Sequence, residues 1–274
     1  MTDDGSFRVI AVETTQTVRG AAVAQGATGD LARIFAELIT GAVLVREAMA
    51  PDLRVQVILQ GDDGRSRLVA DAHPDGTTRG LVQLAKGATS ISIQDRGLLQ
   101  VARTMHNGAI HQGVVQVPSN GSLTEAFMEY MQSSEQVVTF IAVGSVMGDD
   151  GPAQAGGYLV QLLPELEEGQ LMVMTERLKD FESMDALLAS GKGAADLLLA
   201  ETLYAMPHTL VGERELGFAC NCSTARLAAS LATLPREDIE HLVSDGKMLD
   251  IECDFCKTKY EFSPEQLRGL LTPN

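Results

Sequence analysis

The chain has 274 residues, of which 45% are hydrophobic and only 4% aromatic, and its formal net charge is −16. This length predicts one large or two smaller domains, with an aliphatic core because tryptophan is absent. The negative charge argues against nucleic acid as a partner, since its phosphates would be repelled. The N-terminal MTDDGSFRVI is not a secretory signal, and no apolar run approaches the roughly 18 residues of a membrane span. We therefore expect a cytoplasmic protein without a membrane partner.

The first 165 residues alternate strand signals with a few helices. A helix follows Thr28, where apolar residues recur at helical spacing as far as Val45, and another begins at Ser122, a capping residue with Glu125 three positions on. The pattern predicts an α+β protein whose N-terminal mixed α/β core domain covers residues 1–165. The predicted strands are rich in β-branched residues and lie at residues 7–12, 55–59, 90–93, 110–117 and 137–143.

Residues 166–217 differ in composition from the core. Between residues 165 and 217, acidic residues outnumber basic ones by eleven to four, and leucines and methionines keep a loose helical rhythm. This predicts an acidic helical linker of marginal stability that needs a packing partner, which we expect in the module that follows. Two interpretations stay open: ordinary amphipathic helices, or a linker that responds to the redox state of that module.

Residues 218–274 form a small C-terminal module. A unit of this size buries little apolar surface and commonly needs a metal or a disulfide to fold. Leucines at residues 227, 231 and 234 suggest a short helix, and a second begins at Pro235. Strand patterns at residues 248–253 and 259–262 predict a hairpin with a cysteine pair at its turn.

All four cysteines of the chain lie in this module, as Cys220 with Cys222 and Cys253 with Cys256. Thiolates in two close pairs are the ligands that a tetrahedral zinc ion requires. Inert buried thiols would be scattered through the chain, and structural disulfides are uncommon in the cytoplasm. His241 lies between the pairs, but four thiolates already complete the tetrahedron. We predict one zinc ion per chain.

The first cysteine pair is unusual because one residue, rather than two, separates its members. A disulfide across a single residue would close a small strained ring, and strain raises the reduction potential. Such a pair should oxidise only under stress. Structural zinc contributes roughly 10–16 kcal/mol of apparent folding free energy in small peptides. Its loss should unfold the module and expose apolar surface of the kind that binds unfolded proteins.

The sequence around the cysteines closely resembles the zinc centre of the heat-shock protein 33 family. The segments FACNCS at residues 218–223 and CDFCKTKYEF at residues 253–262 carry the resemblance, and Arg226 follows the first of them. Shorter matches, TRG at residues 78–80 and HQG at residues 111–113, extend it over nearly the whole chain. The chain departs from the family at Leu81 and His111, where an aromatic residue and a tyrosine are usual.

The resemblance implies a redox-regulated bacterial chaperone, a holdase that works without ATP and is not an enzyme. It implies that Cys220, Cys222, Cys253 and Cys256 bind zinc in the reduced, inactive state. Oxidation would form the Cys220–Cys222 and Cys253–Cys256 disulfides, release the zinc and unfold the linker. The activated protein would be a homodimer that holds unfolded client proteins under oxidative stress.

Two other classes of function can be weighed against this one. An adaptor or regulatory protein with a constitutive structural zinc module would keep its zinc after mild peroxide treatment. An enzyme is disfavoured, because the sequence has no P-loop and its five histidines show no metal-ligand spacing such as H-E-x-x-H.

Overall fold

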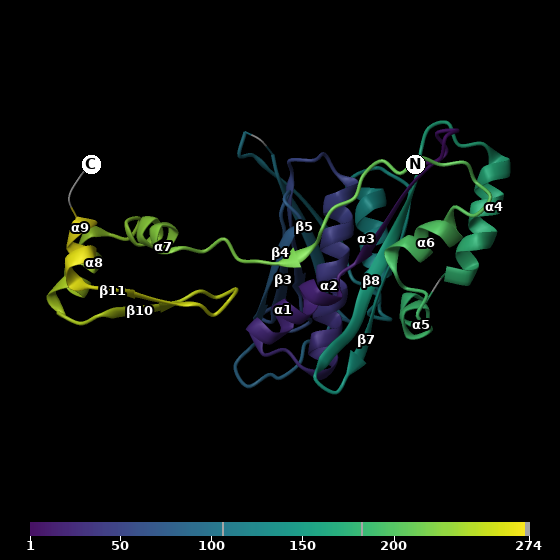
Figure 1. Cartoon of the computed structure of the whole chain (residues 1–274). Helices are drawn as coiled ribbons and strands as arrows, with labels where there is room; N and C mark the ends of the chain where they lie inside the picture. The colour runs from purple at the N-terminus through teal and green to yellow at the C-terminus, as the bar shows by residue number, and fades with distance from the viewer. Residues whose placement is uncertain (106, 182, 272–274) are drawn as a thin grey trace. The chain divides into compact units, whose positions relative to one another are not determined.

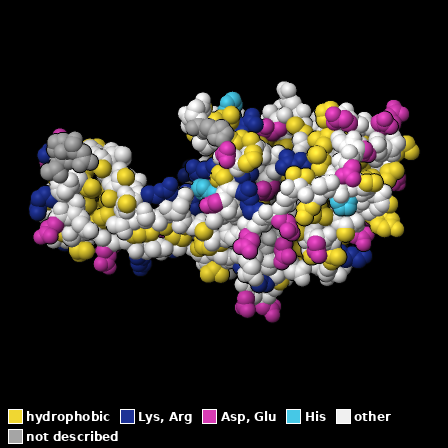
Figure 2. All heavy atoms as spheres, turned by 45° about the horizontal axis from the view of Figure 1, so that its top comes forward, with side chains coloured by type: hydrophobic (Ala, Val, Ile, Leu, Met, Phe, Trp, Pro, Cys, Tyr) yellow, Lys and Arg dark blue, Asp and Glu magenta, His cyan; other side chains and the backbone are white. Residues whose placement is uncertain are grey.

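The computed structural model describes residues 1–105, 107–181 and 183–271. It divides into two compact units, Met1–Phe218 and Ala219–Asn274 (Figure 1). Among the described residues, no helix has the length and apolarity to cross a membrane. Figure 2 shows acidic side chains spread over the visible face, with hydrophobic side chains reaching the surface between them.

The first unit contains two sheets. One has three strands in the order β1-β8-β7 and the other six in the order β6-β5-β2-β3-β4-β9, and all neighbours are antiparallel except β4 and β9. In β2, every second residue is buried, as expected for a strand with one face on a core. The strands are β1 Phe7–Glu13, β2 Arg54–Gln60, β3 Arg67–Ala72, β4 Thr77–Gln83, β5 Leu98–Thr104, β6 Ile110–Gln116, β7 Thr139–Gly148, β8 Gly151–Leu162 and β9 Gly217–Phe218.

Helix α2 (Gly29–Ala48) contacts strands of both sheets, and most of its residues are buried. Close helix–sheet packing requires glycine at Gly80 of β4, because a Cβ there would lie 2.3 Å from the Phe35 ring of α2. Two further helices, α1 (Thr15–Gln25) and α3 (Leu123–Ser133), pack beside α2. The main hydrophobic cluster therefore centres on α2.

The connector that precedes the cysteines is helical in its first two thirds. It comprises α4 (Glu168–Leu178), a 3₁₀ turn (Lys179–Phe181), α5 (Met184–Ala189) and α6 (Ala195–Thr202). Its buried apolar residues join a second hydrophobic cluster with residues of β1, β7 and β8. The sequence suggested a packing partner in the C-terminal module, and this expectation is wrong, because the three-stranded sheet provides it.

The start of α5 docks on β7 at Gly144. The backbone N–H of Ser145 donates to the Asp185 carboxylate over 2.8 Å. A Cβ at Gly144 would lie 2.5 Å from the same carboxylate oxygen, so a larger residue there would displace α5. This glycine therefore fixes where the connector meets the sheet.

The second unit has helices α7 (Thr224–Leu231), α8 (Arg236–Ser244) and α9 (Pro264–Gly269) and a hairpin of β10 (Leu249–Glu252) and β11 (Lys259–Phe262). Among its described residues, Ile239, Phe262 and Leu267 are the buried apolar side chains besides Cys253. The predicted helices and hairpin of the module are confirmed. Its apolar core is small.

Most predicted elements of the first unit are confirmed, but the strand at residues 90–93 is wrong. Ile91 and Ile93 are buried, and this alternation produced the strand pattern. The segment is nevertheless a loop, held by the Asp62 N–H donating to the Ser92 carbonyl over 2.8 Å. The predicted cap of α3 is confirmed, since the Ser122 hydroxyl accepts from the Glu125 N–H over 3.1 Å.

Candidate metal centre

The first cysteine pair lies in the loop that leads into α7. Ser223 caps this helix by accepting the Arg226 N–H over 3.2 Å. The Arg226 guanidinium reaches back and donates to the carbonyl of Asn221, the residue between the two cysteines, over 2.9 Å. Helix capping and this arginine thus fix the backbone that carries Cys220 and Cys222.

The second pair lies in the turn between β10 and β11. The Cys253 N–H donates to the Thr258 carbonyl over 2.9 Å, and the Lys257 N–H donates to the Cys253 carbonyl over 2.8 Å. Lys257 closes the turn with a left-handed φ of 59°. The hairpin therefore holds Cys253 and Cys256 on one tight turn.

The structure brings all four sulfur atoms together. They are free thiols and lie within 4.8 Å of one another. The Cys220 and Cys253 sulfurs are 3.8 Å apart, and those of Cys222 and Cys256 are 3.3 Å apart. Sulfurs bound tetrahedrally at about 2.3 Å from a zinc ion would be separated by about 3.8 Å. The cluster therefore has the size and the ligand type that a tetrahedral metal ion needs.

Histidine 241 does not join this cluster. Within residues 1–105, 107–181 and 183–271, the four cysteines form the only group of three or more histidine, cysteine, aspartate or glutamate side chains that could hold a metal. The ligand set available there consists of sulfur alone, which suits soft or borderline metals rather than magnesium or calcium.

The thiols of the cluster ionise differently. Burial raises the pKa of the Cys222 thiol to about 12, and burial also raises the pKa of Cys253. Burial acts in the same direction on Cys256, but hydrogen bonding with the side chain and backbone of Thr258 outweighs it and lowers the pKa of Cys256 to about 7. A divalent cation at the centre would favour the thiolate at every position.

Two neighbours of the cluster were missed in the sequence. The Tyr260 hydroxyl donates to the Cys222 sulfur over 3.0 Å, and this hydrogen bond is the main reason that the pKa of Tyr260 rises to about 12. The Thr258 hydroxyl lies 3.2 Å from the Cys256 sulfur. Both residues belong to the segment CDFCKTKYEF, but only the fold shows that Tyr260 contacts the other cysteine pair.

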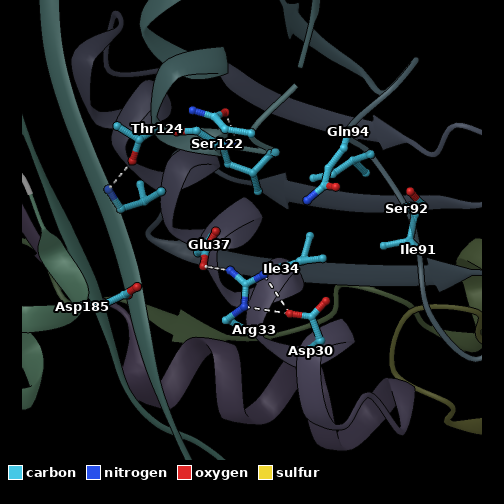
Figure 3. A pocket seen from close by; sticks show the side chains of 15 residues that line it. Asp30, Arg33, Ile34, Glu37, Ile91, Ser92, Gln94, Ser122, Thr124 and Asp185 are labelled. Atoms are coloured by element: carbon cyan, nitrogen blue, oxygen red, sulfur yellow. Dashed lines mark hydrogen bonds and ion pairs between the residues drawn. The ribbon is translucent and has the colours of Figure 1, made fainter. Parts of the chain in front are cut away.

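A second polar site lies in the first unit, in a pocket of about 450 Å³ between α2, α3, β7 and α5 (Figure 3). Arg33 pairs there with Glu37 at 2.6 Å and with Asp30 at 2.8 Å. Burial raises the pKa of Glu37 to about 7, although Arg33 opposes the shift. Asp185 of the connector also lines this pocket.

Comparisons with known proteins find relatives over nearly the whole chain. A family model described as "Hsp33 protein" matches residues 1–263. The "33 kDa chaperonin" of Syntrophotalea carbinolica is 30% identical over 281 residues, which cover 98% of this chain and 96% of that protein. The protein of the same name from Streptococcus pyogenes serotype M49 is 28% identical, with 98% and 95% covered.

A solved structure has the same fold. The crystal structure of the 33 kDa chaperonin, a heat shock protein 33 homolog, from Thermotoga maritima superposes with a TM-score of 0.80 at 23% identity. The match covers 98% of this chain and 94% of that one.

The fold and the cysteine cluster, together with these matches, define a chaperone that carries a potential four-cysteine metal site. The chain belongs to the Hsp33 family. This is a family of chaperones and not of enzymes, and membership implies that the protein binds unfolded polypeptides.

Proposed function

We propose that this protein is a redox-regulated, ATP-independent holdase that prevents the aggregation of unfolded proteins during oxidative stress in the bacterial cytoplasm. In the reduced, inactive state, Cys220, Cys222, Cys253 and Cys256 hold one Zn²⁺. The observation that carries the proposal is the cluster of four free sulfurs within 4.8 Å, in a unit with very few buried apolar residues.

The switch is the oxidation of two thiol pairs. For each pair, one thiolate attacks the peroxide O–O bond and becomes a sulfenic acid, which then condenses with the second thiol to a disulfide and water. Two electrons leave each thiol pair, and one peroxide is reduced to two waters. Zinc held by the four cysteines would keep their thiols in the thiolate form that oxidants attack, and disulfide formation would remove these sulfurs as ligands.

We propose the pairing Cys220–Cys222 and Cys253–Cys256. The sulfur distances do not favour it, because the short contacts of 3.3 and 3.8 Å run between the two pairs. Trypsin separates the alternatives, since Arg214, Arg226, Lys247 and Lys257 place each cysteine pair in its own peptide. The proposed pairing gives two unlinked peptides, each lighter by two hydrogen masses than its reduced form. Disulfides between the two pairs would instead give one species in which the two peptides are linked.

The three parts of the chain take different roles in this proposal. Residues 1–165 form the stable core, residues 166–217 are the redox-responsive linker, and residues 218–274 are the zinc-binding switch. Loss of the zinc would unfold the switch, destabilise the linker and expose apolar side chains that bind clients. The activated protein would be a homodimer. Exposed residues of the linker already include Met172, Tyr204, Leu210 and Val211.

The test is a peroxide titration of the zinc-loaded protein. Zinc release is followed with a chromophoric indicator, free thiols are counted, and light scattering of a heat-unfolded client is recorded in parallel. We expect zinc release, the loss of four thiols and aggregation suppression to rise together. Equal suppression by reduced and oxidised protein would refute the switch. Retained zinc with intact far-UV circular dichroism would support the adaptor with a constitutive zinc module instead.

A further inference from the structure

The segment just before the cysteines is seated on the core as an additional edge strand. Strand β9 pairs in parallel with β4, beside which it lies in Figure 1. Thr77 is opposite Gly217, and Thr78 is opposite Phe218. The Gly217 N–H also donates to the Gly76 carbonyl over 3.2 Å. This strand covers the first two residues of the β4 edge.

The side chains of this segment fill an apolar site. Leu216 and Phe218 are half-buried and pack against the main hydrophobic cluster, whereas residues 209–215 are exposed. The Phe218 ring lies on helix α1 at Gly20, where a Cβ would approach the Phe218 Cβ to 2.6 Å. Gly20 therefore leaves the space that the aromatic ring occupies, and we call this space the Phe218 socket.

The attachment of β9 is short. It pairs over two residues, and parallel pairing is slightly less stable per residue than antiparallel pairing. Farther along β4, the Val82 N–H donates to the Gln25 side chain over 3.0 Å, so a side chain rather than a strand protects that part of the edge. Removal of β9 would leave the Gly76 carbonyl without its Gly217 donor and the apolar socket open. The Thr77 N–H and carbonyl would keep their bonds to Asp75 and His73.

We propose that β9 occupies, in the reduced protein, a docking site that accepts an extended segment of an unfolded client after oxidation. The inference rests on the proposed holdase function and names a client site. Cys220 stands two residues after Phe218, so unfolding of the C-terminal unit removes the folded structure that follows the strand. We expect the client segment to resemble the β9 segment that it replaces. It is an extended chain that adds to the β4 edge and carries two apolar side chains two residues apart, with an aromatic one in the socket.

Two substitutions separate release of β9 from occupation of the socket. Phe218→Ser weakens the docking of β9 and leaves the socket open. Gly20→Leu also expels Phe218 but fills the socket, and it should fold because leucine is a better helix former than glycine. Gly20→Ala should have the same two effects on Phe218 and on the socket, but to a smaller extent. The matched controls are Leu210→Ser, at an exposed linker position, and Gly169→Leu, at a helical glycine with nothing within 4 Å.

The probe is reduced, carboxymethylated α-lactalbumin with a fluorescent label, a permanently unfolded chain whose binding to the full-length protein is measured by anisotropy. We expect reduced Phe218→Ser to bind it at least tenfold more tightly than the reduced wild type. Oxidised Gly20→Leu should bind about tenfold more weakly than the oxidised wild type, with normal zinc release and thiol loss. In the oxidised wild type, the probe should slow hydrogen exchange at residues 77–83.

The outcomes distinguish the two proposals. If oxidised Gly20→Leu binds as the wild type does, or if exchange at residues 77–83 ignores the probe, the client site is wrong while the holdase function stands. If the oxidised wild type fails to bind, both are wrong. Protection of residues 77–83 that rises with protein concentration in the absence of the probe would assign the site to a second copy of this chain and overturn the client assignment.

Discussion

Metal removal without oxidation should unfold the second unit and leave the core of the first unit folded. Burial of Ile239, Phe262 and Leu267 contributes about 5–9 kcal/mol if each side chain contributes about 1.5–3 kcal/mol. A structural zinc ion contributes roughly 10–16 kcal/mol in small peptides, so the proposed metal would stabilise this unit more than its buried side chains do. Since whole domains are stable by only about 5–15 kcal/mol, loss of the metal leaves this unit without net stability. The core of the first unit keeps its main hydrophobic cluster and should stay folded.

The assay is hydrogen exchange with mass spectrometry on the full chain, treated with a chelator and a phosphine reductant. Peptides from the hairpin at residues 249–262 should lose their protection, whereas peptides from β5 at residues 98–104 should exchange as before. Addition of zinc should restore the protection of the hairpin peptides. This control excludes irreversible damage as the cause of the faster exchange. If the amides of the hairpin exchange equally slowly with and without metal, while all four thiols are still reduced, the argument that the metal holds this unit together is refuted.

Three further substitutions test one neighbour of the cysteine cluster and two contacts within the first unit. Tyr260→Phe removes the donor to the Cys222 sulfur, so zinc affinity in competition with a chromophoric chelator should fall about tenfold; unchanged affinity would show that the hydroxyl does not support the ligand. Gly144→Ala pushes a methyl group against Asp185 and should destabilise the docking of α5 by about 1–3 kcal/mol, seen as faster amide exchange in that helix, and wild-type exchange rates would contradict this. The pKa of Glu37 is raised from 4.5 to about 7, so the stability it contributes is present below about pH 4.5 and is lost as the pH rises through 7, by up to about 3 kcal/mol. Denaturant unfolding between pH 5 and 7.5 should show this slope in the wild type and a flatter one in Glu37→Gln, and identical slopes would exclude Glu37 as its source.

The cysteine cluster was the part of the site most accessible from the sequence, because its signal is local spacing. Two close pairs predict four converging sulfurs, and the structure brings them within 4.8 Å. The neighbours of the cluster could not be predicted in the same way. Tyr260 reaches Cys222 only because the fold brings the loop of the first cysteine pair to the hairpin, which places residues 38 positions apart in contact.

Glycines explain the largest gap in the predicted fold. Strand β8 contains Gly151, Gly156 and Gly157, which normally disfavour strands, and helix α1 contains Gly20, which normally disfavours helices. At Gly157 a Cβ would lie 2.5 Å from the Ala142 carbonyl oxygen, and at Gly20 it would meet Phe218. Gly20, Gly156 and Gly157 are required by tertiary contacts rather than by local conformation, so the single sequence gives no sign of their purpose. Strands β3, β4 and β5 were missed as well.

The position of the connector's packing partner also decides how the proposed redox signal would travel along the chain. Helices α4 to α6 bury their own apolar residues on the three-stranded sheet, so loss of the second unit does not by itself remove their partner. The weakest attachment of the chain before the cysteines is instead β9, with two paired residues and the half-buried Phe218, after an exposed run at residues 209–215. Release should therefore begin at β9 and proceed toward α6. This order makes the edge of β4 the first surface of the core that oxidation exposes, ahead of the Leu- and Met-rich faces of the connector.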